Sequence, residues 1–377
     1  MRINKWCLCG LAFSSLLFAG EVSAHDIRVS RVRLTDWDEA RQRVMVTFDL
    51  AWKNAWRDAG NWDAAWVFVK VKPAGSNDWR HATLSPEKTD HLPVPASVID
   101  PVPEGTGVFV YRSGLFHGEA SYPDLKVCWT YGDDGYAFAN GTPVAVSVHA
   151  IEMVHVPQGP FLLGSTGAED GHFYAPDETE QTTNAYAVTS EDAIGIGPEV
   201  GKLWGTSTNG YSTIGPAGTL PAAYPKGYRA FYCMKHEGTQ GQYAEFLNQL
   251  TELQAANRYP VVTNEETNRF AISGTYPSIS AAAPDRACNW LSWRDGCAYL
   301  AWAGLRPMTE LEYEKTCRGP ALPVPNEYAW GNAAIVQQTG HAGTDGSGTE
   351  TGTAASGTAN CNYNKGISGP VRAGIYA

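Results

Sequence analysis

Length, composition and charge limit what this chain can be. It has 377 residues, a formal net charge of −11 and a charged fraction of 18%, below the ~25% usual in soluble proteins. The negative charge argues against nucleic acid or an anionic membrane surface as a partner. With 39 Gly, 23 Pro and 13 Trp, the chain should be rich in loops held by aromatic contacts. Its length predicts two domains.

The first 24 residues resemble a secretory signal. Arg2 and Lys5 give a positive start, and Leu8 to Ala19 is an apolar run too short to span a bilayer. Val22-Ser23-Ala24 has the small residues of a cleavage site. No later stretch is long enough for a membrane span. We therefore expect residues 1–24 to be removed and the protein to be exported.

Residues 25–150 should form the first domain, an all-β sandwich of immunoglobulin type. Short segments rich in β-branched and aromatic residues alternate with turn residues, which is typical of antiparallel strands. The expected strands include Ile27–Leu34, Val44–Trp52, Ala65–Val71, Val108–Tyr111 and Leu125–Tyr131, with further alternation at Val144, Val146 and Val148. Five tryptophans in this region could stack against a ligand, but core packing is the more common role. They are Trp52, Trp56, Trp62, Trp66 and Trp79.

Residues 151–377 should form the second domain, with mixed α and β structure. Val154–Ser165 has the pattern of strand, turn and strand, and residues 168–230 have few periodic signals. Three capping boxes then predict helices. They are Thr239 with Gln242, Ser292 with Asp295, and Thr309 with Glu312. Gly304 and Gly319 should end the last two helices. The Gly/Thr/Ser composition of residues 340–359 predicts a flexible surface loop.

The common catalytic motifs are missing from the sequence. It contains no nucleophile elbow, no zinc-protease motif, no phosphate-binding loop and no paired cysteines with zinc spacing. The sequence therefore identifies no catalytic and no cofactor-binding residue. Six cysteines follow the signal, at positions 128, 233, 288, 297, 317 and 361. Export permits disulfides, while a thiol pair could instead bind Cu(I). A Cys288–Cys361 bridge is our expectation.

Four segments, in order, resemble the formylglycine-generating enzymes, also called sulfatase-modifying factors. They are VHVPQGPFLLGS (154–165), FYCMKHEGTQGQYAEFLNQL (231–250), NWLSWRDGCAYLAWAGLRPMTELEYEKTCRG (289–319) and EYAWGN (327–332). The resemblance runs from about Glu152 to Ala377. It implies the α+β fold of the C-type-lectin-like superfamily, with much irregular loop.

The resemblance also implies a chemistry. Enzymes of this family bind copper through two cysteines and use O₂ to oxidise a cysteine of a sulfatase-type protein or peptide to formylglycine. Their copper-binding and closing segments do not occur here, so we expect a domain that lacks its C-terminal part and a chain that is inactive. The alternative is a surface protein that binds glycan or protein through the lectin-like domain.

The resemblance gives roles to residues in the matching segments. Asn360 falls where the family places a calcium ligand, and the Cys361 carbonyl could assist it. Cys317 matches a cysteine that usually pairs with one in the part not seen here. Four aromatic residues should be core anchors, namely Trp293, Trp302, Tyr313 and Trp330. Four charged residues should form a network around two helices, namely Arg306, Glu310, Glu312 and Arg318.

Overall fold

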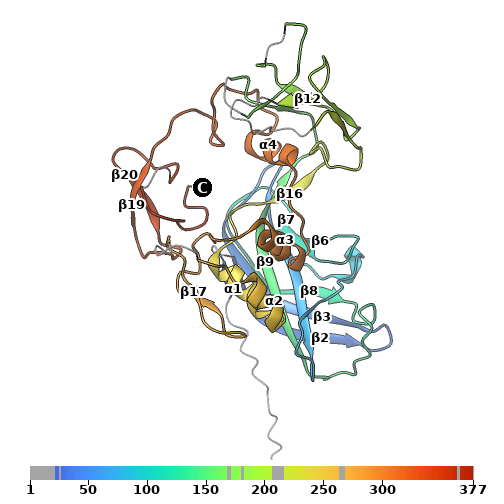
Figure 1. Ribbon diagram of the computed structural model, residues 1–377. Coiled ribbons are helices and arrows are strands. Elements are labelled where there is room, and N and C mark those ends of the chain that lie inside the picture. Colours follow the sequence, from blue (N-terminus) through green and yellow to red (C-terminus); the bar gives the residue numbers. More distant parts are fainter. Residues whose placement is uncertain are drawn as a thin grey trace, which may run out of the picture.

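The computed structural model shows two antiparallel sheets, four short helices and several small hairpins (Figure 1). It describes residues 22–24, 27–167, 171–179, 182–205, 216–262, 268–362 and 366–376. Most of the predicted signal, residues 1–21, therefore lies outside the described residues. No helix in the described ranges is long and apolar enough to cross a membrane.

The first sheet has four strands in the order β1-β2-β3-β8. They are β1 (Val22–Ala24), β2 (Ile27–Asp38), β3 (Arg43–Arg57) and β8 (Phe116–Trp129). The second sheet has the order β16-β9-β4-β7-β6, with β5 paired to β4. Its strands are β4 (Asp63–Pro73), β5 (Arg80–His81), β6 (Ser97–Pro101), β7 (Val108–Arg112), β9 (Val144–Val156) and β16 (Phe231–Met234). A single turn of 3₁₀ helix, Lys88–Asp90, precedes β6.

The remaining strands form two-stranded pairs. They are β10 (Phe161–Leu163) with β12 (Tyr186–Val188), β11 (Phe173–Tyr174) with β14 (Trp204–Gly205), β13 (Ile194–Ile196) with β15 (Gly218–Leu220), β17 (Ile272–Ser273) with β18 (Ser280–Ala281), and β19 (Gln338–Ala342) with β20 (Thr351–Ala354). The strands expected from sequence in residues 27–165 are confirmed. The small pairs after residue 170 were not expected, because strands of two to five residues are too short to show a clear period.

Four helices follow, and each begins with a capping box. They are α1 (Gln240–Asn248), α2 (Glu252–Arg258), α3 (Trp293–Trp302) and α4 (Glu310–Arg318). The three capping boxes expected from sequence are confirmed. The fourth, Thr251 with Gln254, opens α2. The sequence therefore contained the signal for α2, although we predicted no helix there.

The described chain thus has a β-rich first region followed by a mixed α+β region. Buried residues of both sheets contribute to one apolar core. Strand β9 extends from Val144 to Val156 and pairs with β4 along its length and with β16 at its end. Since β16 comes after residue 230, this sheet joins the two regions of the chain.

Strand β4 is buried on both faces from Asp63 to Val71. One face belongs to the core between the two sheets, whereas Trp66 and Phe68 pack against α1 and α3. Trp66 is 2% exposed, and its Nε1 donates to the carbonyl of Ala303 at 2.8 Å. Burying two faces of one strand removes a large apolar area from water, so β4 ties α3 to the sandwich.

A buried lysine lies on the same face of β4. The Nζ of Lys70 donates to the Trp302 carbonyl at 2.5 Å and lies 3.0 Å from Nδ1 of His81. The Nε2 of His81 lies 2.5 Å from the carbonyl of Thr106, so Nε2 carries the proton and Nδ1 accepts. Burial lowers the pKa of Lys70 to about 7 and that of His81 to about 4.

A cluster of charged residues lies at the first residue of β4, where β4, β9 and the end of β16 come together. The Nζ of Lys235, which follows β16, lies 3.0 Å from Asp63 of β4 and 3.3 Å from Glu152 of β9. Asp63 also accepts from Nε1 of Trp52 at 3.0 Å. Desolvation raises the pKa of Asp63 despite the nearby ammonium group. Because both carboxylates are buried, removing the lysine would leave charges without compensation.

Three of the four expected aromatic anchors are not core residues. Trp293 is 75% exposed and Tyr313 52% exposed, while Trp330 is partly exposed and stacks on Tyr328 with ring centroids 4.7 Å apart. Trp302 does pack against the core, 5.1 Å from Phe68 in an edge-on arrangement. The face of α3 that turns to the sheet carries Tyr299 and Trp302, which leaves Trp293 of the first turn outside.

The expected flexible loop at residues 340–359 is also corrected. It contains the hairpin of β19 and β20, and Glu350 between the two strands is fully buried. Composition gave the wrong answer because charged contacts from distant segments, described below, hold the turn.

Substitution of Lys70 by methionine should flatten the pH dependence of stability. In the wild type, the unfolded lysine holds its proton up to its ordinary pKa, whereas the folded lysine loses it above about 7. Stability should therefore rise by about 2 kcal/mol between pH 7 and 9. The variant should lose this rise, as measured by urea unfolding at several pH values. Lys72→Met, at a half-exposed position on the same strand, is the control. An unchanged slope in Lys70→Met would refute this account.

Candidate functional site

Helix α4 carries charged residues on several faces, and its ends are fixed by local chemistry. At its start, Oγ1 of Thr309 accepts from the Glu312 amide at 3.2 Å, and Glu312 accepts from the Thr309 amide at 2.8 Å. At its end, Gly319 adopts a φ of 64°, which favours glycine. These two caps determine where α4 begins and ends.

The charges of α4 form two separate ion-pair groups. Arg306 binds the buried carboxylate of Glu312 through two bonds of 2.8 and 2.6 Å, which holds the pKa of Glu312 below its ordinary value despite its burial. Arg318 pairs with Glu327 and also donates to the carbonyls of Leu162 and Gly164. The four-residue network expected from sequence is therefore two groups, and Glu310 belongs to neither.

A groove of about 570 Å³ lies between α4 and the small strand pairs of residues 171–224. Its walls expose slightly more apolar than polar surface and come from β11, β13, β15, the segment before β14 and α4. They include Phe173, Ile196, Leu203, Leu220 and Leu311. Most of these side chains also belong to the small core beneath. The volume and the lining resemble those of small-molecule sites.

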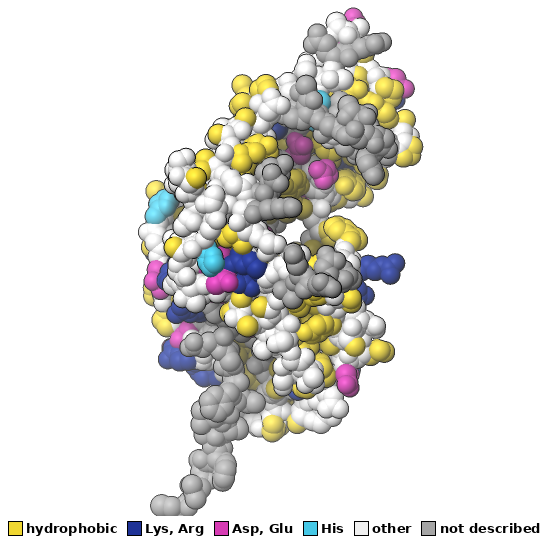
Figure 2. Space-filling view, turned by 60° about the vertical axis from the view of Figure 1, so that its left-hand side comes forward, with side chains coloured by type: hydrophobic (Ala, Val, Ile, Leu, Met, Phe, Trp, Pro, Cys, Tyr) yellow, Lys and Arg dark blue, Asp and Glu magenta, His cyan; other side chains and the backbone are white. Residues whose placement is uncertain are grey.

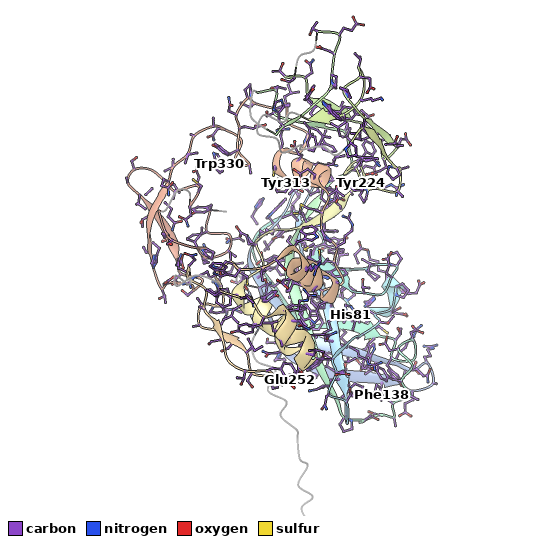
Figure 3. All side chains as sticks on the ribbon, viewed as in Figure 1. His81, Phe138, Tyr224, Glu252, Tyr313 and Trp330 are labelled. Carbon is purple, nitrogen blue, oxygen red and sulfur yellow. The ribbon has the colours of Figure 1, made fainter. Side chains whose placement is uncertain are left out.

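Polar groups gather at the α4 side of this groove. Glu310 and Glu314 are one helical turn apart and both line it, as does Tyr224. Figure 3 places Tyr224 beside α4. Glu314 accepts from the Gly164 amide at 3.0 Å and lies 3.7 Å from Nη1 of Arg318. Burial raises the pKa of Glu314, although both of these contacts oppose the rise.

Tyr224 is held in place by a buried lysine. The Nζ of Lys226 donates to the carbonyls of Pro221 and Tyr224, both at 2.6 Å. The amide of Lys226 donates to Glu191 at 2.7 Å. Lys226 is fully buried, so these contacts brace the loop from beneath. The loop that carries Tyr224 at the rim of the groove is therefore held by the hydrogen bonds of Lys226.

The groove was not predicted from the sequence. The pair Glu310 and Glu314 on a capped helix was visible as two acids on one face, but nothing in the sequence placed β13 and β15 opposite them. Figure 2 shows a second hollow, a deep notch between the two ends of the molecule with hydrophobic side chains on its rim.

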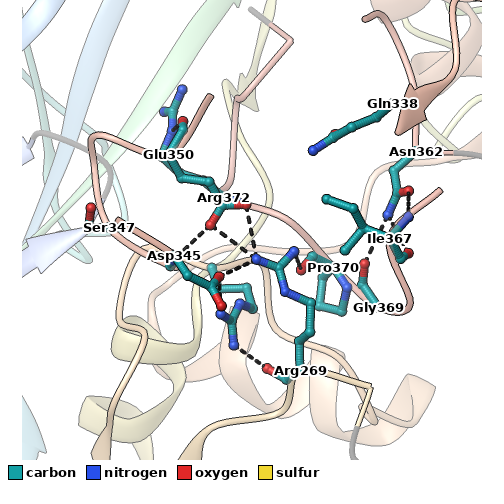
Figure 4. Close-up of polar contacts among 12 residues, drawn as sticks. Arg269, Gln338, Asp345, Ser347, Glu350, Asn362, Ile367, Gly369, Pro370 and Arg372 are labelled. Carbon is teal, nitrogen blue, oxygen red and sulfur yellow. Dashed lines mark hydrogen bonds and ion pairs between the residues drawn. The ribbon is translucent and has the colours of Figure 1, made fainter. Parts of the chain in front are cut away.

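A second polar cluster surrounds the turn between β19 and β20 (Figure 4). Asp345 pairs with Arg269 and Arg286, and the buried Glu350 accepts from Arg269 at 3.1 and 3.2 Å. The Nε of Arg372 donates to the Glu350 carbonyl at 2.9 Å. The carboxylates and guanidinium groups mostly bind one another and backbone carbonyls. This cluster therefore holds distant segments together and offers no open ligand position.

Asn360, the expected calcium ligand, links its own segment to the backbone of residues 334–336. Its Oδ1 accepts from the Val336 amide at 2.9 Å and its Nδ2 donates to the Ala334 carbonyl at 3.0 Å. The carbonyl of Cys361 accepts from the Gln338 amide at 2.8 Å. In the described part of the chain, no three His, Cys, Asp or Glu side chains come close enough to hold a metal ion. A calcium site at Asn360 stays a prediction.

The six cysteines are all free thiols, so the expected Cys288–Cys361 bridge is wrong. Cys288 donates its amide to Gly238 and packs beside α1 and α3, whereas Cys361 pairs with Gln337 in another part of the fold. Burial raises the pKa of Cys233 and Cys317, and it raises that of Cys288 to about 12. Copper(I) binds thiolates, and burial opposes the thiolate form at these three cysteines. Burial therefore disfavours copper binding at Cys233, Cys288 and Cys317.

Comparison with known proteins agrees with the sequence resemblance. Residues 203–361 match the family described as the sulfatase-modifying factor enzyme 1-like domain. That range includes all four helices, one wall of the groove and the β19–β20 hairpin, and it begins after the resemblance at residues 154–165.

A curated relative matches a short part of the chain. Hercynine oxygenase from Mycolicibacterium thermoresistibile is 38% identical over 63 residues, which cover 16% of this chain and 14% of the relative. No solved structure matches this chain. Residues 203–361 of this chain thus belong to the sulfatase-modifying factor enzyme 1-like domain family.

Proposed function

We propose that this chain acts as a binding protein built on a scaffold of the sulfatase-modifying factor type, with the groove beside α4 as its ligand site. The observation that supports this most directly is the 570 Å³ groove, which has apolar walls and two carboxylates at one side. Neither catalytic thiols nor a metal cluster lies there among the described residues.

A second candidate function is oxidation of a protein cysteine with copper and O₂. The family match supports it, since the family includes oxidoreductases and the relative from Mycolicibacterium thermoresistibile is named an oxygenase. Burial raises the pKa of Cys233 and Cys317, which disfavours the thiolate form that copper would need. We therefore rank it below binding for this chain, and we infer that this chain does not catalyse the reaction.

We also propose that the protein is exported, and that its natural ligand is part of a glycan or protein outside the cytoplasm. The signal-like residues 1–24 support export. The net charge of −11 makes nucleic acid an unsuitable partner.

We further propose that the β-rich region is a sandwich of immunoglobulin type. In that fold the order A-B-E faces the order G-F-C. Here β2-β3-β8 faces β16-β9-β4, which supports the same order with β16 as the last strand. The order β4-β7-β6 beyond strand C is a variation. An experimental structure of the whole protein without β16 beside β9 would contradict this assignment.

Blocking the groove should abolish binding of neutral aromatic compounds. Thr219 lies on the exposed surface of β15 and lines the groove, so Thr219→Trp should fill it without loss of stability. Tryptophol should give a saturation-transfer NMR signal with the wild type and lose at least ~80% of it with this variant, since the ring excludes the ligand. Thr275→Trp, on an exposed turn between β17 and β18, should keep the signal.

Equal tryptophol signals in the wild type, Thr219→Trp and Thr275→Trp would contradict the groove as the binding site. The absence of any signal from the wild type would contradict it as well.

The chain should produce no aldehyde from a cysteine-containing sulfatase-type peptide when it is loaded with copper and exposed to air. Mass spectrometry of the peptide measures the product. A copper-dependent aldehyde that disappears in the double variant Cys233→Ser, Cys317→Ser would instead establish the second candidate function.

A further inference from the structure

The charges around the groove indicate what kind of ligand it takes. From these charges we infer that the groove binds a small organic cation, an amine with an apolar body, and that Glu310 and Glu314 receive the ammonium group. This inference rests on the proposed binding function of the groove. It adds the chemical class of the ligand, which neither the family match nor the relative assigns to these residues.

Negative charge at the α4 side of the groove is incompletely balanced. Glu310 is exposed, and in the ranges that the structure describes its carboxylate has no hydrogen-bond or ion-pair partner. Glu314 has Arg318 at 3.7 Å, but that guanidinium also pairs closely with Glu327. Arg318 is therefore shared by two carboxylates and Glu310 has no counter-ion, which leaves a net negative charge beside the groove.

The ammonium groups of the nearby lysines bind other partners. The Nζ of Lys226 is buried beneath the loop, where it donates to the carbonyls of Pro221 and Tyr224. Lys202, which precedes the groove residue Leu203, pairs with Glu199 at 3.1 Å. Among the described residues that line the groove, an anionic ligand would meet two carboxylates and no lysine or arginine, so the groove disfavours it.

The apolar part of the lining suits the carbon skeleton of a ligand. Phe173, Ile196 and Leu220 lie on the elements across the groove from the two acids. Tyr224 lines the same space, and its ring already lies 5.9 Å from the Nζ of Lys226. A hydrated metal ion would gain nothing from these walls, whereas an aliphatic or aromatic amine would bury its carbon skeleton against them. The volume of 570 Å³ admits a molecule of this class.

The test compares two ligands of nearly the same shape. Tryptamine carries an ammonium group where tryptophol carries a hydroxyl, so their difference in affinity isolates the charge. Titration calorimetry or NMR should show that the wild type binds tryptamine about tenfold more tightly than tryptophol. The double variant Glu310→Gln, Glu314→Gln should bind both alike. Glutamine keeps an oxygen that can accept from the Gly164 amide, so the fold should persist.

Glu252→Gln on α2 is the matched control, because it removes one exposed acid far from α4 (Figure 3). It should keep the tenfold preference. Equal affinities of the wild type for tryptamine and tryptophol would overturn the inference and leave the proposed binding function standing. Failure of both compounds to bind the groove would overturn the proposed function itself. A preference that survives in the double variant would show that other groups receive the cation.

Discussion

The burial of both faces of β4 is the constraint on which the rest of the structure depends. A strand that covers one face of a sandwich normally presents its other face to water. In β4 that second face carries Trp66, Phe68 and Lys70, and all three are buried by the second region of the chain. Exposing the two large aromatic rings would cost several kcal/mol, so the sandwich and the helices stabilise each other.

This arrangement also explains where the candidate site lies. Strand β16 pairs with β9, and the chain continues from β16 into the helices α1, α3 and α4. Lys315 of α4 donates its Nζ to the carbonyls of Pro157 and Gly227 at 2.8 and 2.6 Å, which anchors the helix to the segments that flank β10 and β16. Glu310, Leu311 and Glu314 of the same helix line the groove. Helix α4 thus both anchors the fold and carries the two carboxylates of the candidate site.

The sequence predicts local structure here better than it predicts contacts. Capping boxes identified the starts of three helices because such signals act over three residues. The exposure of Trp293 could not be predicted, since the burial of a residue on α3 depends on which face meets Trp66 and Phe68. The composition of residues 340–359 suggested a flexible loop, and Arg269 and Arg286, more than 50 residues earlier, hold it instead. The groove was missed for the same reason, because its two walls are far apart in sequence.

Hydrogen exchange of the variant Trp66→Ala tests the mutual stabilisation most directly. Removing this side chain leaves a cavity and takes away the donor to Ala303, which should cost about 3–5 kcal/mol. If the sandwich and the helices form one cooperative unit, amides in β3 and in α3 should lose protection by the same free energy. If β3 keeps its wild-type protection while α3 alone loses it, the two regions fold independently and the account is wrong.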